Sequence, residues 1–483
     1  MFKIKSMRSI YFLNLIVLLL GSCAIPKENS LNQQIQLPES YYLNSNDTLQ
    51  VPLKTWREYF KDPYLQNLID SAISNNIELQ IINQRLYAAR AEYIMNRNYM
   101  YPSVNTFVSS GLTRFGDYTI DGVGNFDTNK SPNINEKQKI PNPIPDYFVG
   151  LNTNWEINTV GKLRNNKRAS FYRFLANKEG KHFLTTQIVA EVARLYYELL
   201  ALDTELEIIR RNIFIQERAL EIVAIQKQSG RINEAGVKQF YAQLLNFKSL
   251  EADKIQEINA TENILNNLVG RFPQKILRKD TIDVKDLPAL LNIGVPVHLL
   301  QNRPDIKEAE KNLKAKSYEL KSAKAAFYPN ILINANYGLN AFKNELLFST
   351  PNSLAYGLIA GITTPLINRN QIKGNFRMAQ ANQSIAFLNL KQAILKGVEE
   401  VNSEYVKLEQ YRNISNLKNQ EVATLRQAVQ ISNELFLTGY ANYMEVLVSR
   451  QNRLNAELQL TEANKNQFFA AIQLYKVLGG GWQ

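Results

Sequence analysis

Apolar residues recur in alternating steps of three and four along much of the chain, which is the pattern of long helices that pack along one seam. The clearest run comprises Ile188, Val192, Leu195, Leu199, Leu202, Leu206, Ile209 and Ile213. No proline lies between Gly161 and Gly230, so the pattern predicts one helix over residues 161–229. At 1.5 Å per residue this helix is roughly 100 Å long, and no compact domain requires a helix of that length.

The stretch "QSGRINEAGV", residues 228–237, interrupts this pattern. Gly230 is suited to the left-handed conformation that ends a helix, and Asn233 is suited to capping the helix that follows. A second helix is therefore predicted over residues 237–269, where "GRFP" supplies a glycine and a proline as stop signals.

The same features return later in the chain, which indicates an internal duplication. Gly230 and Gly270 lie 40 residues apart, and so do Gly439 and Gly479. The break "QSGRINEAGV" aligns with "LTGYANYMEV", and a second apolar seam runs over residues 394–408. Chance similarity between helices rich in Asn, Gln and Leu is the alternative explanation.

The duplication predicts a division of the chain into two repeats. Each repeat begins with a helix that has proline at its first position, Pro63 after Asp62 and Pro304 before Asp305. The predicted segments are a first repeat over 62–270, a linker over 271–303, a second repeat over 304–479 with long helices at 371–437 and 444–478, and a tail over 480–483.

Each repeat also contains two alternating segments of about ten residues that are aromatic or β-branched. They predict β-hairpins over 103–157 and 330–366, and the Gly-, Asn- and Pro-rich stretch 116–145 is interpreted as the long loop of the first. About ten residues is the length of a tilted strand that crosses a bilayer, although periodicity alone leaves a soluble hairpin equally open. Four strands cannot close around a lumen, so a barrel would need several copies of the chain.

The N-terminus has the pattern of an export signal. A basic segment precedes a largely apolar region of ten residues, "YFLNLIVLLL", and "LGSC" follows. This pattern predicts a signal peptide over 1–22, a covalent lipid on Cys23, and a lipidated N-terminal segment over 23–61. A membrane anchor is the alternative, but the apolar run is about half the length of a spanning helix. Beyond it no apolar run is long enough to span, so any membrane span in the mature chain is expected to be β-structure.

Composition argues against catalysis and against nucleic acid as a partner. The 483 residues include one cysteine and two histidines, His182 and His298, which leaves little for metal binding or imidazole chemistry. We therefore expect no enzyme activity, no metal and no cofactor beyond the lipid on Cys23. The formal charge of +12 contains no basic cluster interleaved with aromatic residues, so nucleic acid is not an expected partner.

The order of these motifs resembles the TolC-like outer-membrane efflux factors, and most closely their lipoprotein branch of the OprM/NodT type. The motifs are the lipobox, "YFKDPYLQNLI", "YP" before a hairpin, a long helix and "RPDI", with the later motifs repeated. The resemblance covers nearly the whole chain from Cys23 to Trp482. It implies a mainly α fold with β-structure, built as a homotrimer: a long α-helical barrel, an equatorial belt that includes 23–61 and 271–303, and a transmembrane β-barrel with four strands per chain.

The resemblance implies an exit duct of a tripartite efflux system, which is lipid-anchored in the outer membrane and extends into the periplasm. Its implied partners are a periplasmic adaptor protein, an inner-membrane resistance-nodulation-division pump and outer-membrane lipid. An exit channel for type I protein secretion and a non-conducting trimeric structural lipoprotein are the alternatives. A structural spacer has no evident use for the two hairpins, which favours the duct.

Residues at the periplasmic tip follow from the same resemblance. The two helix breaks would lie there, with Gly230, Arg231, Gly439 and Tyr440 as adaptor-docking residues. Relatives commonly carry an acid in the constriction at the position of Val448. Glu445, one helical turn earlier, is therefore the candidate for negative charge at the constriction, although an acid at the start of a helix is the simpler interpretation.

Overall fold

The computed structural model describes residue 38 and residues 54–287, 296–364 and 369–483. The predicted signal peptide, Cys23 and most of the segment 23–61 lie outside the described residues, as does part of the linker 271–303. The chain forms two compact units. The described part of the first consists of residues 88–174, 312–364 and 369–386, and the second contains nearly all the rest. Each unit takes segments from both predicted repeats.

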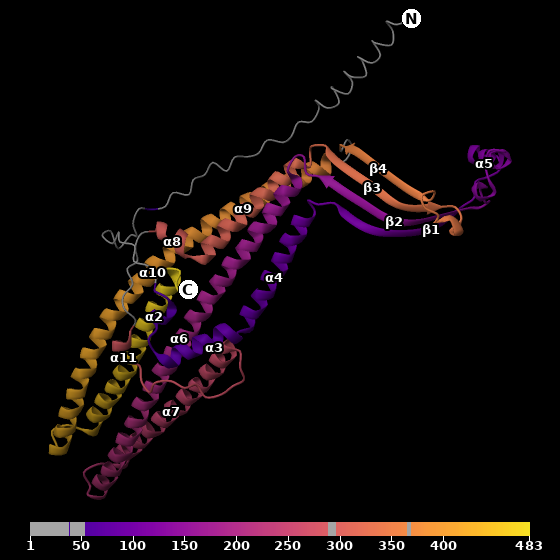
Figure 1. Ribbon diagram of the computed structural model, residues 1–483. Coiled ribbons are helices and arrows are strands. Elements are labelled where there is room, and N and C mark those ends of the chain that lie inside the picture. Colours follow the sequence, from indigo (N-terminus) through magenta and orange to yellow (C-terminus); the bar gives the residue numbers. More distant parts are fainter. Residues whose placement is uncertain (1–37, 39–53, 288–295, 365–368) are drawn as a thin grey trace. The chain divides into compact units, whose positions relative to one another are not determined.

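The first unit contains an antiparallel sheet with the strand order β1-β2-β3-β4 (Figure 1). The two predicted hairpins therefore pair with each other through β2 and β3. At this junction Gly150 lies opposite Gly338, and a Cβ on either would lie within 2.6 Å of backbone atoms of the other strand. The strands are β1 (Ser103–Thr113), β2 (Ile144–Ile157), β3 (Asn330–Ala341) and β4 (Leu354–Thr363).

The loop between β1 and β2 contains a helix, α5 (Ile120–Lys130), so the interpretation of this stretch as a plain loop was wrong. Its two internal glycines disfavour a helix by propensity. The Thr119 side chain accepts a hydrogen bond from the backbone N–H of Gly122 at 3.1 Å and so caps its start. Asn129 then fixes its end, because its side chain donates to the Ile140 carbonyl at 2.9 Å and accepts from the Ile140 N–H at 2.8 Å.

Helices make up most of the described chain, and the long ones agree closely with the apolar pattern. The long helix predicted over 161–229 is α6, and the helix predicted from 237 begins three residues earlier because Asn233 caps it. The helices outside the β1–β2 loop are α2 (Trp56–Tyr59), α3 (Pro63–Asn75), α4 (Ile77–Asn98), α6 (Lys162–Gln228), α7 (Glu234–Val269), α8 (Val297–Asn302), α9 (Pro304–Ala325), α10 (Arg369–Thr438) and α11 (Tyr443–Val477).

The core of the second unit follows the predicted seam of α6. Seven of its eight residues are buried and Leu206 is half-buried. Side chains from α2, α3, α4, α7 and α11 also contribute to this core, including Leu65, Leu265 and Phe468, each of which has no exposed surface. A second cluster contains the later seam, with Ile394, Val401 and Leu408 buried against the end of α11. Burial of this apolar surface is the main force that holds the long helices together.

Four glycines at equivalent places support the predicted duplication. Gly230, Gly270, Gly439 and Gly479 have φ values of 68°, 82°, 84° and 95°, which is the left-handed region that other residues avoid. In each case the glycine N–H donates to a carbonyl three residues back, and the next N–H donates five residues back. This pair of hydrogen bonds closes a helix end, so the same terminator occurs at both helix ends of each hairpin.

Candidate functional site at the turns between the long helices

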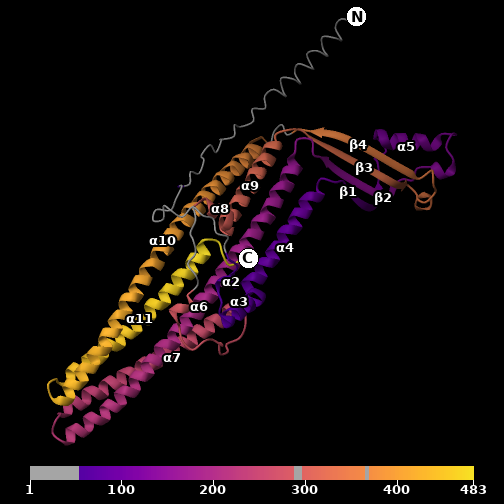
Figure 2. The ribbon, with the colours of Figure 1, turned by 60° about the vertical axis from the view of Figure 1, so that its left-hand side comes forward.

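Two short turns join the long helices in pairs, α6 to α7 and α10 to α11 (Figure 2). In the first turn Gly230 and Arg231 donate their backbone N–H groups to the carbonyls of Lys227 and Gln226, both at 3.0 Å. In the second turn Gly439 and Tyr440 make the matching bonds, at 3.2 and 2.8 Å. Backbone hydrogen bonds therefore fix the shape of each turn and leave the side chains free for contacts.

The side chains of the predicted docking residues are exposed in both turns. Tyr440 is 86% exposed, and Arg231 is also exposed. An exposed aromatic ring and an exposed guanidinium are the residue types that dominate protein–protein interfaces. Both turns lie at the same end of the second unit, so they present one composite surface (Figure 2).

Each turn ends in an asparagine that caps the next helix. Asn233 accepts a hydrogen bond from the N–H of Gly236 at 2.9 Å, and Asn442 accepts from that of Glu445 at 3.1 Å. The carboxylate of Glu445 accepts in return from the Asn442 N–H, at 3.4 Å, which completes a capping box. The interpretation of Glu445 as a helix-start acid therefore agrees with its contacts. A role of Glu445 in a constriction stays a prediction, and Val448 is exposed.

The two turns contact each other through Tyr443, the first residue of α11. Its ring lies against the first turn of α7, where a Cβ on Gly236 would lie 3.5 Å from the ring atoms Cε1 and Cζ. Tyr443 packs on a small cluster of buried residues, Ala219, Val223 and Phe240. This contact was not predicted from the sequence. The signals that were available are an aromatic residue directly after the cap Asn442 and a glycine three residues after the cap Asn233 of the other repeat.

Polar contacts within the two hairpins differ. In the first, Lys227 forms an ion pair with Glu234 across the turn, and its hydrogen bond and charge lower the pKa of the Glu234 carboxyl. In the second, the Ser432 and Ser449 hydroxyls lie 3.0 Å apart, and Arg450 donates to the Asn433 side chain at 3.1 Å. An ion pair therefore joins the two arms of the first hairpin near its turn, whereas hydrogen bonds join the arms of the second there.

Apolar burial decreases toward the turns. The main core of the second unit contains large side chains from six helices, including Tyr196, Phe468 and Tyr475. The cluster nearest the turns has three buried members, Ala219, Val223 and Phe240. Regions with few buried apolar contacts open at lower free energy than the rest of a structure. The hairpin ends are thus the part of this unit best suited to move.

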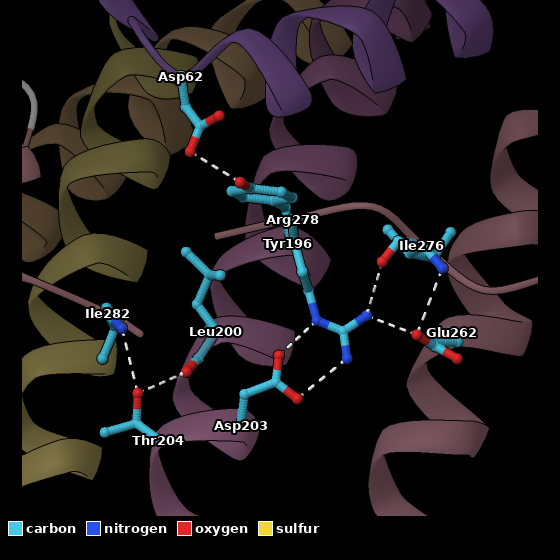
Figure 3. A network of polar contacts seen from close by, with 9 residues as sticks. All are labelled: Asp62, Tyr196, Leu200, Asp203, Thr204, Glu262, Ile276, Arg278 and Ile282. Carbon is cyan, nitrogen blue, oxygen red and sulfur yellow. Dashed lines mark hydrogen bonds and ion pairs between the residues drawn. The ribbon is translucent and has the colours of Figure 1, made fainter. Parts of the chain in front are cut away.

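The linker after α7 is held by a buried arginine (Figure 3). Arg278, with 9% of its side chain exposed, donates to both oxygens of Asp203 at 2.5 and 3.0 Å and to Glu262 at 2.5 Å. Burial lowers the pKa of Arg278, but hydrogen bonds to Asp203 and Glu262 outweigh burial, so its net pKa is raised. Nearby, Thr204 accepts from the Ile282 N–H at 3.1 Å. These contacts join the linker to α6 and α7.

A phenol and a carboxylate extend this network to the start of α3. The Tyr196 hydroxyl donates to Asp62 at 2.7 Å (Figure 3). Burial, and then the hydrogen bond to the Asp62 carboxylate, raises the pKa of Tyr196. The same Asp62 accepts from the Tyr64 N–H at 2.9 Å and caps α3. One carboxylate therefore both starts a helix, as its position before Pro63 predicts, and ties that helix to α6.

The motif "RPDI" does more than start a helix. Arg303, with 5% of its side chain exposed, donates to Asp305 at 3.0 and 2.7 Å and to Glu400 at 2.8 Å. It also donates to the Val477 carbonyl at 3.1 Å. Apart from its part in the family resemblance, this motif predicts a helix start at Pro304, which the structure confirms. The arginine additionally joins α9 to α10 and to the end of α11.

No helix among the described residues is both long enough and apolar enough to cross a membrane. No group of three or more His, Cys, Asp or Glu side chains in the described part of the chain is arranged to hold a metal ion.

Comparison with known proteins gives the family. A model described as "Outer membrane efflux protein" matches residues 68–271 and 295–480. The cation efflux system protein CusC of Escherichia coli O6:H1 is 25% identical over 456 residues, 93% of each sequence. The probable outer membrane lipoprotein SilC of Salmonella typhimurium is 25% identical over 429 residues, 88% of each. The crystal structure of the CmeC outer membrane channel of Campylobacter jejuni matches with a TM-score of 0.82, at 18% identity and over 95% of each chain.

The family match begins inside α3, five residues after its first residue Pro63, and ends after α11, with a gap over the middle of the linker. Its two segments thus correspond to the two repeats, and each contains one hairpin of strands and one hairpin of long helices. The chain therefore belongs to the outer membrane efflux protein family and is the outer-membrane exit component of an efflux system.

Proposed function

We propose that three copies of this chain form a continuous duct that carries small molecules from an inner-membrane pump and a periplasmic adaptor out of the cell. The observation that carries this proposal is the four-stranded sheet with two free edges, β1 and β4. Free edges present unpaired backbone groups, and closure of a sheet on itself removes them. Pairing β1 of one copy with β4 of the next would give a twelve-stranded barrel from three copies.

The exposed surface of the sheet supports a membrane location for these strands. Several large apolar side chains that share one face of the edge strands are more than half exposed in the single chain: Val104, Val108, Leu112, Leu358 and Ile362. A soluble monomer rarely exposes so many apolar side chains on one element, whereas an apolar outer face is required for strands that contact lipid.

The long helices supply the periplasmic part of the proposed duct. α6 has 67 residues and α10 has 70, so each is about 100 Å long at 1.5 Å per residue. A passage needs no reaction centre, and the relatives are efflux proteins rather than enzymes. Selection of the substrate would then rest with the pump.

We further propose that the turns of the helix hairpins dock the adaptor and that Arg231 contributes to this contact. Arg231→Glu reverses an exposed charge without touching a buried contact, so the fold should persist while adaptor binding weakens about tenfold or more. The measurement is cross-linking of the adaptor in cells together with export of the pump's substrate.

Arg218→Glu is the matched control for this variant, because Arg218 is another exposed arginine, which lies on α6 outside the turn. This control should leave both readouts unchanged. Full adaptor cross-linking and export in the Arg231→Glu variant would show that the turn is not the docking surface, without bearing on the duct itself.

Lipid attachment at Cys23 is a separate proposal, since it rests on the "LGSC" motif alone. Cys23→Ser should abolish incorporation of a labelled fatty acid, because no other cysteine exists in the chain. The variant should still insert into the outer membrane, because the strands and not the lipid span it under this account. Acyl labelling that survives the substitution would rule out Cys23 as the modified residue.

A further inference from the structure

The two loops at one end of the sheet expose large apolar side chains. In the β1–β2 loop, Tyr118 and Ile120 are fully exposed, at 103% and 93%, and Phe126 is 62% exposed. In the β3–β4 loop, residues 342–353, Phe348 is 73% exposed. Isolated exposed apolar residues are normal, but a group of them at one site indicates a surface that becomes covered.

A cavity of about 490 Å³ lies beside α5 in the first of these loops. Its apolar lining comes from Phe115, Val123, Phe126, Ile140, Pro141 and Ile144, and its polar lining consists of Asp117 and three asparagines. The paired hydrogen bonds between Asn129 and Ile140 hold its two walls together. An apolar cavity of about 150 Å³ accepts benzene, so this one has room for an aromatic side chain.

Strand topology identifies what can reach this cavity. β1 runs directly into the loop that contains α5, and β4 begins directly after the loop that contains Phe348. All neighbouring strands are antiparallel, so pairing β1 with β4 of another copy brings the end of β1 at Thr113 and the start of β4 at Leu354 to the same end of the sheet. The α5 loop of one copy then adjoins the Phe348 loop of the next.

Within one copy the same two loops are further apart. β2 and β3 separate β1 from β4, and at a strand spacing of about 4.8 Å this amounts to roughly 14 Å. Between copies one spacing of about 4.8 Å separates them. In both views α5 lies toward the end of the sheet where β1 ends and β4 begins (Figures 1 and 2).

We propose that the phenyl ring of Phe348 in one copy packs into the cavity beside α5 of the neighbouring copy and so locks the copies together at this end of the sheet. The inference rests on the homotrimer proposed above, because it requires the free edges of β1 and β4 to meet between copies. The occupant is a second copy of this chain, since the strand order that brings the two loops together continues directly from the sheet.

Cysteine cross-linking tests this contact. The chain has no cysteine other than Cys23, so Val123→Cys combined with Phe348→Cys introduces one defined pair. Mild oxidation of the assembled protein in membranes should give disulfide-linked dimers and trimers on a denaturing gel. The control pair is Val123→Cys with Phe272→Cys, because Phe272 is an aromatic residue at 92% exposure outside both loops.

Three outcomes are distinguishable. Linked multimers from the Val123–Phe348 pair, with none from the Val123–Phe272 control pair, support the proposal. A trimeric mass without linked multimers, or with links confined to single chains, overturns this contact and leaves the duct proposal intact. A monomeric mass overturns both.

A stability measurement gives an independent readout. Phe348→Ser should lower the temperature at which the trimer dissociates in detergent by on the order of 5 °C, because an apolar contact between copies is lost. Phe348→Leu should recover most of this loss, and Phe272→Ser should cause none. Phe348 is exposed in the single chain, so the substitution leaves the fold of each copy intact. An unchanged dissociation temperature for Phe348→Ser would contradict the proposal.

Discussion

Replacing Tyr443 with alanine is expected to raise the resting conductance of the channel in planar bilayers by about 5- to 30-fold. The Tyr443 ring packs between the two helix hairpins, against Gly236 and the small cluster formed by Ala219, Val223 and Phe240. Removing this half-buried ring costs about 1–2 kcal/mol of contact between the hairpins. A free-energy change of that size shifts the equilibrium between the closed and the open tip by about 5- to 30-fold. If the hairpin ends form the closed tip, loosening them opens it.

Tyr440→Ala is the matched control, because Tyr440 is the same residue type in the same turn but is 86% exposed and outside the cluster. It should leave the conductance unchanged and weaken adaptor docking instead. The opposite assignment, in which Tyr440→Ala opens the channel and Tyr443→Ala does not, would mean that the contact between the hairpins does not control closure.

Arg278→Ala is expected to destabilise the second unit by about 3–5 kcal/mol, since it leaves the partly buried carboxylates of Asp203 and Glu262 without their cation. The expected result is a thermal midpoint lowered by on the order of 10 °C, measured by circular dichroism, with new protease cleavage in the linker 271–287. The linker should become accessible because Arg278 is its main anchor to α6 and α7.

Two further variants separate this effect from a general loss of charge. Arg210→Ala removes an exposed arginine from α6 whose pair with Glu251 is worth about 0.2–1 kcal/mol. Arg278→Met combined with Asp203→Leu and Glu262→Leu replaces the whole cluster with apolar groups and should recover much of the stability. An Arg278→Ala variant as stable as Arg210→Ala would contradict the anchoring role.

Local signals predicted most of the helical architecture. Three signals can be read without knowing the fold: the apolar seam that begins at Ile188, the absence of proline before Gly230, and the residues at helix starts. The helix starts at Asp62 and Asn233 depend on contacts within a few residues of the chain. The helix α5 was missed because its glycines oppose a helix by propensity, whereas the cap from Thr119 and the contact between Asn129 and Ile140 stabilise it.

In the candidate site, too, local features were predictable from the sequence and long-range contacts were not. The turns were predictable because glycine and asparagine have conformational preferences of their own. The anchoring residues were not, because their partners are distant in the chain: Arg278 lies 75 residues from Asp203 and Arg303 lies 97 residues from Glu400. A lone arginine in a sequence does not indicate which carboxylate it will meet. Tyr443 was missed for the same reason, since Gly236 belongs to the other repeat.

The central claim is that copies of this chain assemble into a conducting duct. The most direct test is to purify the mature protein in detergent, determine its oligomeric mass by light scattering, and record its conductance in a planar bilayer. The account predicts a mass of three chains, each at most the 55.3 kDa of the full sequence, and single-channel conductance that rises in the Tyr443→Ala variant. A monomer, or a trimer that does not conduct even when the hairpin contact is removed, would contradict it.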